Sequence, residues 1–213
     1  MKIGIIGATG KAGSAVFQES VTRGHDTVAI VRDQARATEV LGDQAPVLKR
    51  DAFALTAEDL AGFDVVVDAF GTSPDQAQKH VDLARHLVEC AGPKQPRLVF
   101  ILGAGSLVTG EDRHLFIEEI RKAPGAEAWI SIPEQQLQEL AYLRTIEHVK
   151  WVGASPQATF APGRASKPMI GVDELLLAAD GKSHTTTGTM AVALLDEIEQ
   201  PRHHNTRFTV GDA

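Results

Sequence analysis

The chain has 213 residues, 43% hydrophobic and 23% charged, which suits one globular domain whose core needs no disulfides. Its 21 lysines and arginines and 28 acidic residues give a net charge of −7, which argues against a broad nucleic-acid-binding face and favours small-molecule partners. A single cysteine, Cys90, excludes an internal disulfide, and no apolar run approaches membrane-spanning length, so we expect a cytoplasmic protein without membrane contact.

The first thirteen residues, MKIGIIGATGKAG, predict a strand, a tight turn and a helix. The apolar run ends in Gly7, Gly10 and Gly13, after which apolar residues recur at helical spacing. Gly7 allows the sharp turn, Gly10 allows a ligand to approach the backbone, and Gly13 allows the helix to pack closely on the sheet. Free N–H groups in the first helical turn would bind a pyrophosphate. A glycine-rich turn without a ligand is the alternative.

The second predicted strand, DTVAIVR, ends at Arg32. In dinucleotide-binding folds an acidic residue at this place binds the ribose 2′-hydroxyl of NAD, whereas an arginine binds the 2′-phosphate of NADP. Arg32, with Arg36 one helical turn later, therefore favours NADP. A solvated Arg32 beside Asp33 is the alternative.

Strands and helices alternate through the middle of the chain. The predicted elements are a strand over 46–49, a short helix with Thr56 as N-cap and Asp59 in a capping-box arrangement, a strand over 64–71, a helix over 77–91 that ends before Gly92-Pro93, and a strand over 97–106. This alternation predicts an α/β fold, a doubly wound parallel sheet of the Rossmann type. Ligands of such sheets bind beyond the carboxyl ends of the strands.

Beyond residue 107 the pattern loosens, and we expect a small C-terminal substrate lobe. The predicted elements there are lid or substrate loops over 108–125, a helix over 133–147, a strand over 148–156, a helix over 191–198 and a strand over 208–210. No repeat or linker interrupts the chain. Residues 1–213 therefore predict one domain, with residues from about 107 on contributing the substrate lobe.

Several motifs occur in an order that resembles a known family: GATGKAG, RDAFALT, VVVDAFG, LGAGSL and ASPQATFAPG. The chain resembles the atypical short-chain dehydrogenase/reductase group, which includes NAD(P)H:flavin reductase-like, biliverdin reductase B-like and NmrA-like proteins. The likeness spans nearly the whole chain. It implies that a nicotinamide dinucleotide binds along the carboxyl edge of the sheet.

The resemblance also implies which residues contact that dinucleotide. They are Gly7, Thr9, Gly10, Lys11, Ala12 and Gly13 at the pyrophosphate, Arg32 at the 2′-phosphate, Asp51, Ala52 and Phe53 at the adenine, Ala69, Phe70 and Gly71 at the nicotinamide ribose, and Gly103 to Ser106, Ser155 and Pro156 around the nicotinamide ring.

The chain departs from the classical short-chain dehydrogenases in one respect. Their Tyr-x-x-x-Lys pair is missing, because Tyr142 is followed four residues later by Ile146. A flavin or quinone can accept a hydride without a strong enzymatic acid, since water can complete the protonation. Ser106 is the candidate best placed to hydrogen-bond an acceptor, and Tyr142 is the second catalytic candidate. A turn serine and a core tyrosine are the alternatives.

The histidines give weaker signals. His80 and His114 could donate protons, although surface or internally bonded histidines are the more common case. His203-His204 has no nearby cysteine or carboxylate at metal-ligand spacing, so it predicts a turn and no metal site.

Taken together, these features predict an NADPH-dependent oxidoreductase that transfers a hydride to a flavin, quinone or similar small planar acceptor, with FMN among the candidate substrates. A non-catalytic NAD(P)-sensing regulator of the NmrA-like type is the alternative. Both a monomer and a homodimer remain open.

Overall fold

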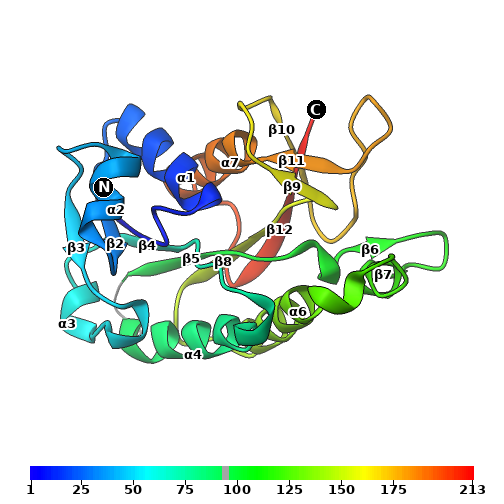
Figure 1. The fold of residues 1–213 in the computed structure, drawn as a ribbon, viewed down its shortest axis with the longest axis horizontal. Coiled ribbons are helices and arrows are strands. Elements are labelled where there is room, and N and C mark those ends of the chain that lie inside the picture. The colour runs from blue at the N-terminus through cyan, green and yellow to red at the C-terminus, as the bar shows by residue number, and fades with distance from the viewer. Residues whose placement is uncertain (93–95) are drawn as a thin grey trace.

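The computed structural model describes residues 1–92 and 96–213, and within them eight strands form a central sheet with helices on both faces (Figure 1). The strands of this sheet are β1 (Lys2–Ile6), β2 (Asp26–Val31), β3 (Val47–Lys49), β4 (Val65–Asp68), β5 (Arg97–Ile101), β8 (Trp151–Ser155), β10 (Pro168–Gly171) and β12 (Thr206–Asp212). Their order is β10-β12-β8-β5-β4-β1-β2-β3. Neighbouring strands are parallel except for β10, which pairs antiparallel with β12 at one edge. The Rossmann-type fold predicted from the alternating elements is confirmed.

The strand order reverses direction at β1. From β1 the chain builds outward through β2 and β3, then crosses back to place β4 on the other side of β1 and continues through β5 and β8. The loops that leave β1 and β4 therefore diverge at the carboxyl edge of the sheet. Such a switch point opens a crevice where ligands bind in this class of fold.

Helices cover the two faces in separate groups. The helices are α1 (Lys11–Thr22), α2 (Gln34–Leu41), α3 (Ala57–Leu60), α4 (Lys79–Ala91), α5 (Ile117–Ile120), α6 (Ser131–Leu143) and α7 (Thr187–Glu199). The first face carries α1, α2 and α7, and the other carries α4 and α6 (Figure 1). Two small sheets pair β6 (Val108–Thr109) with β7 (His114–Leu115) and β9 (Thr159–Ala161) with β11 (His184–Thr186). No helix of the described ranges is long and apolar enough to cross a membrane.

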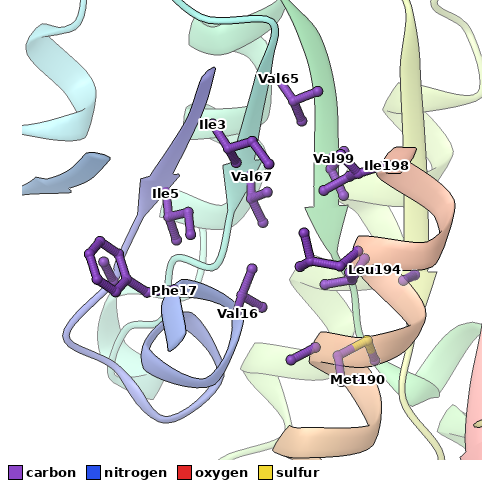
Figure 2. Close-up of a cluster of buried hydrophobic side chains, with 14 of the residues drawn as sticks. Ile3, Ile5, Val16, Phe17, Val65, Val67, Val99, Met190, Leu194 and Ile198 are labelled. Carbon is purple, nitrogen blue, oxygen red and sulfur yellow. The ribbon is translucent and has the colours of Figure 1, made fainter. Parts of the chain in front are cut away.

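The face under α1 and α7 is a continuous apolar layer. Figure 2 shows Ile5 and Val67 of the sheet pointing toward Val16 of α1 and Leu194 of α7, and all four side chains are fully buried. Each such side chain contributes roughly 1.5–3 kcal/mol when it leaves water. Since both faces of the sheet are covered, its strands read as apolar runs without alternation. This apolar layer fixes the position of α1, and with it the glycine loop, relative to the sheet.

Several predicted boundaries are confirmed and others shift. The capping box of Thr56 and Asp59 is present, with the Asp59 N–H donating to Thr56 Oγ1 at 3.2 Å and the Thr56 N–H donating to Asp59 Oδ2 at 3.0 Å. The strand predicted over 97–106 ends at Ile101, because Ala104–Ser106 forms a turn of 3-10 helix. Pro93, predicted to follow the end of α4, lies outside the described residues.

The C-terminal half differs more from the prediction. The helix expected over 133–147 spans 131–143, because after Leu143 the chain tightens into turns in which the Ile146 N–H donates to the Leu143 carbonyl. Strands β9, β10 and β11 were not predicted, since each is short and obtains its partner from a distant segment. Residues after 107 form α5 and α6, and they also supply three strands of the central sheet, β8, β12 and β10.

Candidate functional site

The glycine loop between β1 and α1 turns sharply at Gly7, whose φ is +71°. The Gly10 N–H donates to the Gly7 carbonyl at 2.8 Å, which closes the turn. Gly10 is the N-cap residue of α1, and no described side chain caps this helix end. The first N–H groups of α1 are therefore open to an anion at the positive end of the helix dipole.

Two of these glycines are required by packing. A Cβ atom at Gly7 would lie 2.5 Å from the carbonyl oxygen of Ala69, and one at Gly13 would lie 2.2 Å from the carbonyl oxygen of Gly7. Both distances are far below van der Waals contact. The loop is thus pressed between the start of α1 and the end of β4, which forms one side of the crevice at the switch point.

Two cavities open on this carboxyl edge. The larger, here called the central cavity, has a volume of about 960 Å³, and the smaller, here called the arginine cavity, has a volume of about 320 Å³. They share the lining residues Gly7, Thr9, Phe70, Gly71 and Thr72, so they adjoin along the loops that follow β1 and β4. An extended ligand can therefore occupy both at once.

The arginine cavity collects positive charge. Its lining includes Arg32, Arg36, Arg50 and Lys79, together with the carboxylates of Asp33 and Asp51. Arg36 pairs with Glu39 at 2.7 Å and Arg50 with Asp59 at 3.0 Å, whereas the ion pairs of the described residues include none of Arg32. Arg32 follows β2 directly and is exposed, so its guanidinium is available to an anionic ligand.

A short turn after β3 completes this cavity. Asp51 accepts a hydrogen bond from the Phe53 N–H at 3.0 Å and so caps the turn Ala52–Ala54. The Phe53 ring then meets the Phe70 ring edge to face, with centroids 5.8 Å apart. The two aromatic rings link the wall of the arginine cavity to the loop that both cavities share.

The central cavity has walls from two parts of the chain. One wall is the glycine loop and the segments that follow β4 and β5. The other comes from Ile120, Trp129, Ile132, Pro133 and Gln136, and residues 156–158 with Phe160 close it beyond β8. Most of these positions carry apolar side chains, which suits a site for a flat organic group.

Most residues expected to bind the dinucleotide line one of the two cavities. These are Gly7, Thr9, Gly10, Lys11, Ala12, Arg32, Asp51, Ala52, Phe53, Ala69, Phe70, Gly71, Gly103 and Pro156. Gly13 and Ser155 line neither of them, and neither do the two catalytic candidates, Ser106 and Tyr142.

Ser106 and Ser155 are joined by a buried arginine that sequence reasoning missed. Arg207 of β12 is 2% exposed, and its Nη1 donates to Ser106 Oγ at 3.1 Å and to Ser155 Oγ at 3.0 Å. The guanidinium also pairs with Asp173, with Nε 3.1 Å from Oδ1. Both serine hydroxyls therefore serve as hydrogen-bond acceptors inside the protein. The signal that was available was a lone arginine within the apolar strand RFTV.

Tyr142 lies on the side of α6 that meets α4. The guanidinium of Arg85 sits over its ring, 4.9 Å from the centroid, and burial raises the pKa of its hydroxyl. The arrangement makes Tyr142 part of the contact between two helices, outside both cavities.

Two buried carboxyl groups were also missed, one of them directly before Ala69 of the central cavity. Asp68, the last residue of β4, accepts a hydrogen bond from the Phe70 N–H at 2.9 Å, and burial raises its pKa to about 7. Glu139 of α6 is 2% exposed, and burial together with the charge of Asp68 raises its pKa. These two carboxyl groups retain protons at a pH where exposed acids have lost them.

His80 belongs to the same region and lines the central cavity. It is 5% exposed, its ring meets Phe70 edge to face at 5.4 Å, and burial lowers its pKa to about 4. The imidazole is therefore neutral near pH 7. The sequence shows this histidine, but nothing in the spacing around it distinguishes it from a surface residue.

A mostly parallel sheet with a glycine loop at its switch point, and two adjoining cavities on its carboxyl edge, defines a Rossmann-type nucleotide-binding protein. A family model described as NAD(P)H-binding matches residues 7–158. The chain belongs to this NAD(P)H-binding family, as its resemblance to the atypical short-chain dehydrogenases/reductases implied.

Similar proteins are matched over nearly their whole length. The uncharacterized protein YwnB of Bacillus subtilis is 38% identical over 213 residues, covering 99% of this chain and 98% of that protein. A crystal structure of a Lactobacillus casei protein, also 38% identical, superposes with a TM-score of 0.92 and full coverage of both chains. A proposed NADH-flavin reductase of Streptococcus pneumoniae is 30% identical, with a TM-score of 0.88 and full coverage of both chains.

Proposed function

We propose that this protein is an NADPH-dependent oxidoreductase that transfers a hydride to a flavin, quinone or similar small planar acceptor. The observation that carries the proposal is the pair of adjoining cavities, one lined by arginines and one mostly apolar, on either side of the glycine loop. A phosphorylated nucleoside suits the first cavity, and a nicotinamide with an acceptor suits the second. The 30% identity to a proposed NADH-flavin reductase supports the reaction class.

The residues present fit a dinucleotide. The open N–H groups at the start of α1, and glycines that leave no room for a Cβ, are suited to a pyrophosphate. We propose that Thr9, Gly10, Lys11 and Ala12 contact it, that Arg32 binds the 2′-phosphate, and that Asp51, Ala52 and Phe53 border the adenine. On the nicotinamide side we propose Ala69, Phe70, Gly71, Gly103 and Pro156. Gly13 and Ser155 would support the site indirectly. Gly13 does so by packing closely on Gly7, and Ser155 by accepting a hydrogen bond from Arg207.

The chain's own contribution to the reaction is position and shielding. A bound nicotinamide supplies the hydride, and the apolar wall of the central cavity keeps water away from it. His80 is neutral, and Ser106 and Tyr142 lie outside the cavities, so we expect water to protonate the reduced acceptor. We expect a small-molecule partner, a cytoplasmic location, and no nucleic-acid or membrane partner, with both monomer and homodimer compatible.

One observation favours a second candidate, an NAD(P)-sensing regulator without chemistry. Within the described residues, the two catalytic candidates chosen from the sequence line neither cavity. A protein that only binds the dinucleotide needs no proton donor there.

A turnover assay separates the two candidates. The purified protein would be mixed with NADPH and, in turn, riboflavin, FMN or a naphthoquinone, and the loss of absorbance at the NADPH band would be followed. We expect steady oxidation that saturates with acceptor. NADPH binding, measured as a rise in melting temperature, with no oxidation by any of the three acceptors would instead support the regulator.

A further inference from the structure

One wall of the central cavity contains an aromatic side chain that the structure leaves open. Trp129 lines the cavity and is 42% exposed, whereas the other tryptophan, Trp151, is 1% exposed and donates its indole N–H to the Ile146 carbonyl. A large ring on a cavity wall offers a flat surface that a ligand can cover.

The segment that carries Trp129 is anchored at both ends. Ala126 before it and Ile120 earlier are buried, and after it Ser131 Oγ donates to the Pro74 carbonyl at 2.7 Å. Pro74 follows the β4 loop that the two cavities share, so this hydrogen bond ties the wall to the cofactor side of the crevice. The indole is thus presented by a held segment and not by a free loop.

The same wall offers no charge. Among the described residues that line the central cavity, Lys11 alone has a charged side chain near pH 7, and it belongs to the glycine loop. His80 is uncharged there. An ionised group placed against Trp129 would lose part of its hydration without meeting an opposite charge on that wall, which costs binding free energy. The arginine cavity, with Arg32, Arg36, Arg50 and Lys79, is the contrasting case.

We propose that Trp129 is the stacking platform for the hydride acceptor, and that it selects flat aromatic acceptors whose ring carries no ionised group. The proposal rests on the proposed function and names its substrate class more narrowly. In the reaction a neutral quinone gains the hydride from NADPH and one proton from water, and the products are a hydroquinone and NADP⁺.

The test compares two acceptors that differ by one charge. Isothermal titration would measure the affinity of 1,4-naphthoquinone and of 1,4-naphthoquinone-2-sulfonate for the protein saturated with 1,4,5,6-tetrahydro-NADP, whose nicotinamide ring is uncharged like that of NADPH and donates no hydride. We expect the neutral quinone to bind at least about tenfold more tightly, because the sulfonate must be desolvated. Equal or tighter binding of the sulfonate would overturn the selection for an uncharged ring.

Variants test the platform itself. W129A should weaken naphthoquinone binding about tenfold, the upper range for an aromatic pair, and W129F should retain most of the affinity. NADPH affinity and the melting temperature should stay unchanged in both, since Trp129 lies on the acceptor wall and is partly exposed. L177A is the control, because Leu177 is 62% exposed and lines neither cavity. Unchanged quinone affinity in W129A would overturn the platform.

Turnover then separates this inference from the proposed function. Steady NADPH oxidation by 1,4-naphthoquinone, with KM raised about tenfold in W129A and kcat little changed, would support both. If quinone binding depends on Trp129 but NADPH is not oxidised, two statements are overturned: that Trp129 holds a hydride acceptor, and that the protein is a reductase. NADPH oxidation that is indifferent to W129A would leave the reductase standing and overturn the platform.

Discussion

The two cavities on the carboxyl edge of the sheet differ in charge and in how their walls are built. The arginine cavity is lined by residues that directly follow strands, such as Arg32 after β2 and Asp51 shortly after β3. The outer wall of the central cavity comes from residues between 120 and 136. In the sequence, these residues are distant from the strand ends that they face across the cavity. Under the proposed function, recognition of the nucleotide is thus a local property of strand ends, whereas recognition of the acceptor depends on tertiary packing.

The largest expected effect on nucleotide binding concerns the glycine loop that both cavities share. In G13A the new Cβ would lie 2.2 Å from the Gly7 carbonyl oxygen, so the loop or α1 must move. We expect the free energy of unfolding to fall by about 3 kcal/mol, and NADPH to lose its effect on the melting temperature. G62A is the control, since the nearest atom to its Cβ would be Lys2 Nζ at 3.9 Å. If G13A bound NADPH with normal affinity, the proposal that the glycine loop forms part of the nucleotide site would be contradicted.

The largest pH-dependent effect on stability is expected at Asp68, the last residue of β4. Its pKa is raised from 3.8 to about 7, so between these values the folded protein holds a proton that the unfolded chain has lost. The free energy of unfolding therefore falls as pH rises from about 4 to about 7. The three-unit shift corresponds to a loss on the order of 4 kcal/mol.

Urea denaturation of D68N and wild type at pH 4.5 and pH 8 would measure this loss. D68N cannot ionise, so its stability should decline less over that range. E139Q should flatten the profile in the same direction, because burial also raises the pKa of Glu139. If the free energy of unfolding of all three proteins changed equally with pH, ionisation of these carboxyl groups would not destabilise the fold.

A smaller effect is expected at Arg32, on the nucleotide side of the comparison. R32A should lower the affinity for NADPH about tenfold, since it removes a charged hydrogen-bond donor from the 2′-phosphate, and leave the affinity for NADH unchanged. Calorimetric titration with both nucleotides measures this. R164A, an exposed arginine that lines neither cavity, is the matched control. Equal losses for NADPH and NADH would contradict the 2′-phosphate assignment.

The smallest effect separates packing from chemistry at Ser106. S106A removes one hydrogen bond from the buried Arg207 and should lower the free energy of unfolding by about 1 kcal/mol, with little change in kcat. S155A should behave alike, because Ser155 Oγ accepts from the same nitrogen. A large drop in kcat in S106A alone, with unchanged stability, would return Ser106 to the catalytic role predicted from the sequence.

The first half of the fold could be predicted because its signals are local. The glycine spacing, the capping box at Thr56 and the apolar strands each occupy a few consecutive residues. Arg207 could not be assigned, since its partners Ser106 and Asp173 are 101 and 34 residues away. Strand β10 likewise exists through its pairing with β12, and the position of Trp129 depends on how residues 120–136 pack.

The residues that line both cavities can be distinguished from those that line one, and this distinction guides protein engineering. Substitutions at Gly7, Thr9 or Phe70 alter both compartments at once. Arg32 and Trp129 each line one compartment alone. Under the proposed function, coenzyme preference and acceptor range can therefore be changed independently, provided that the glycine loop between the two cavities is left unchanged.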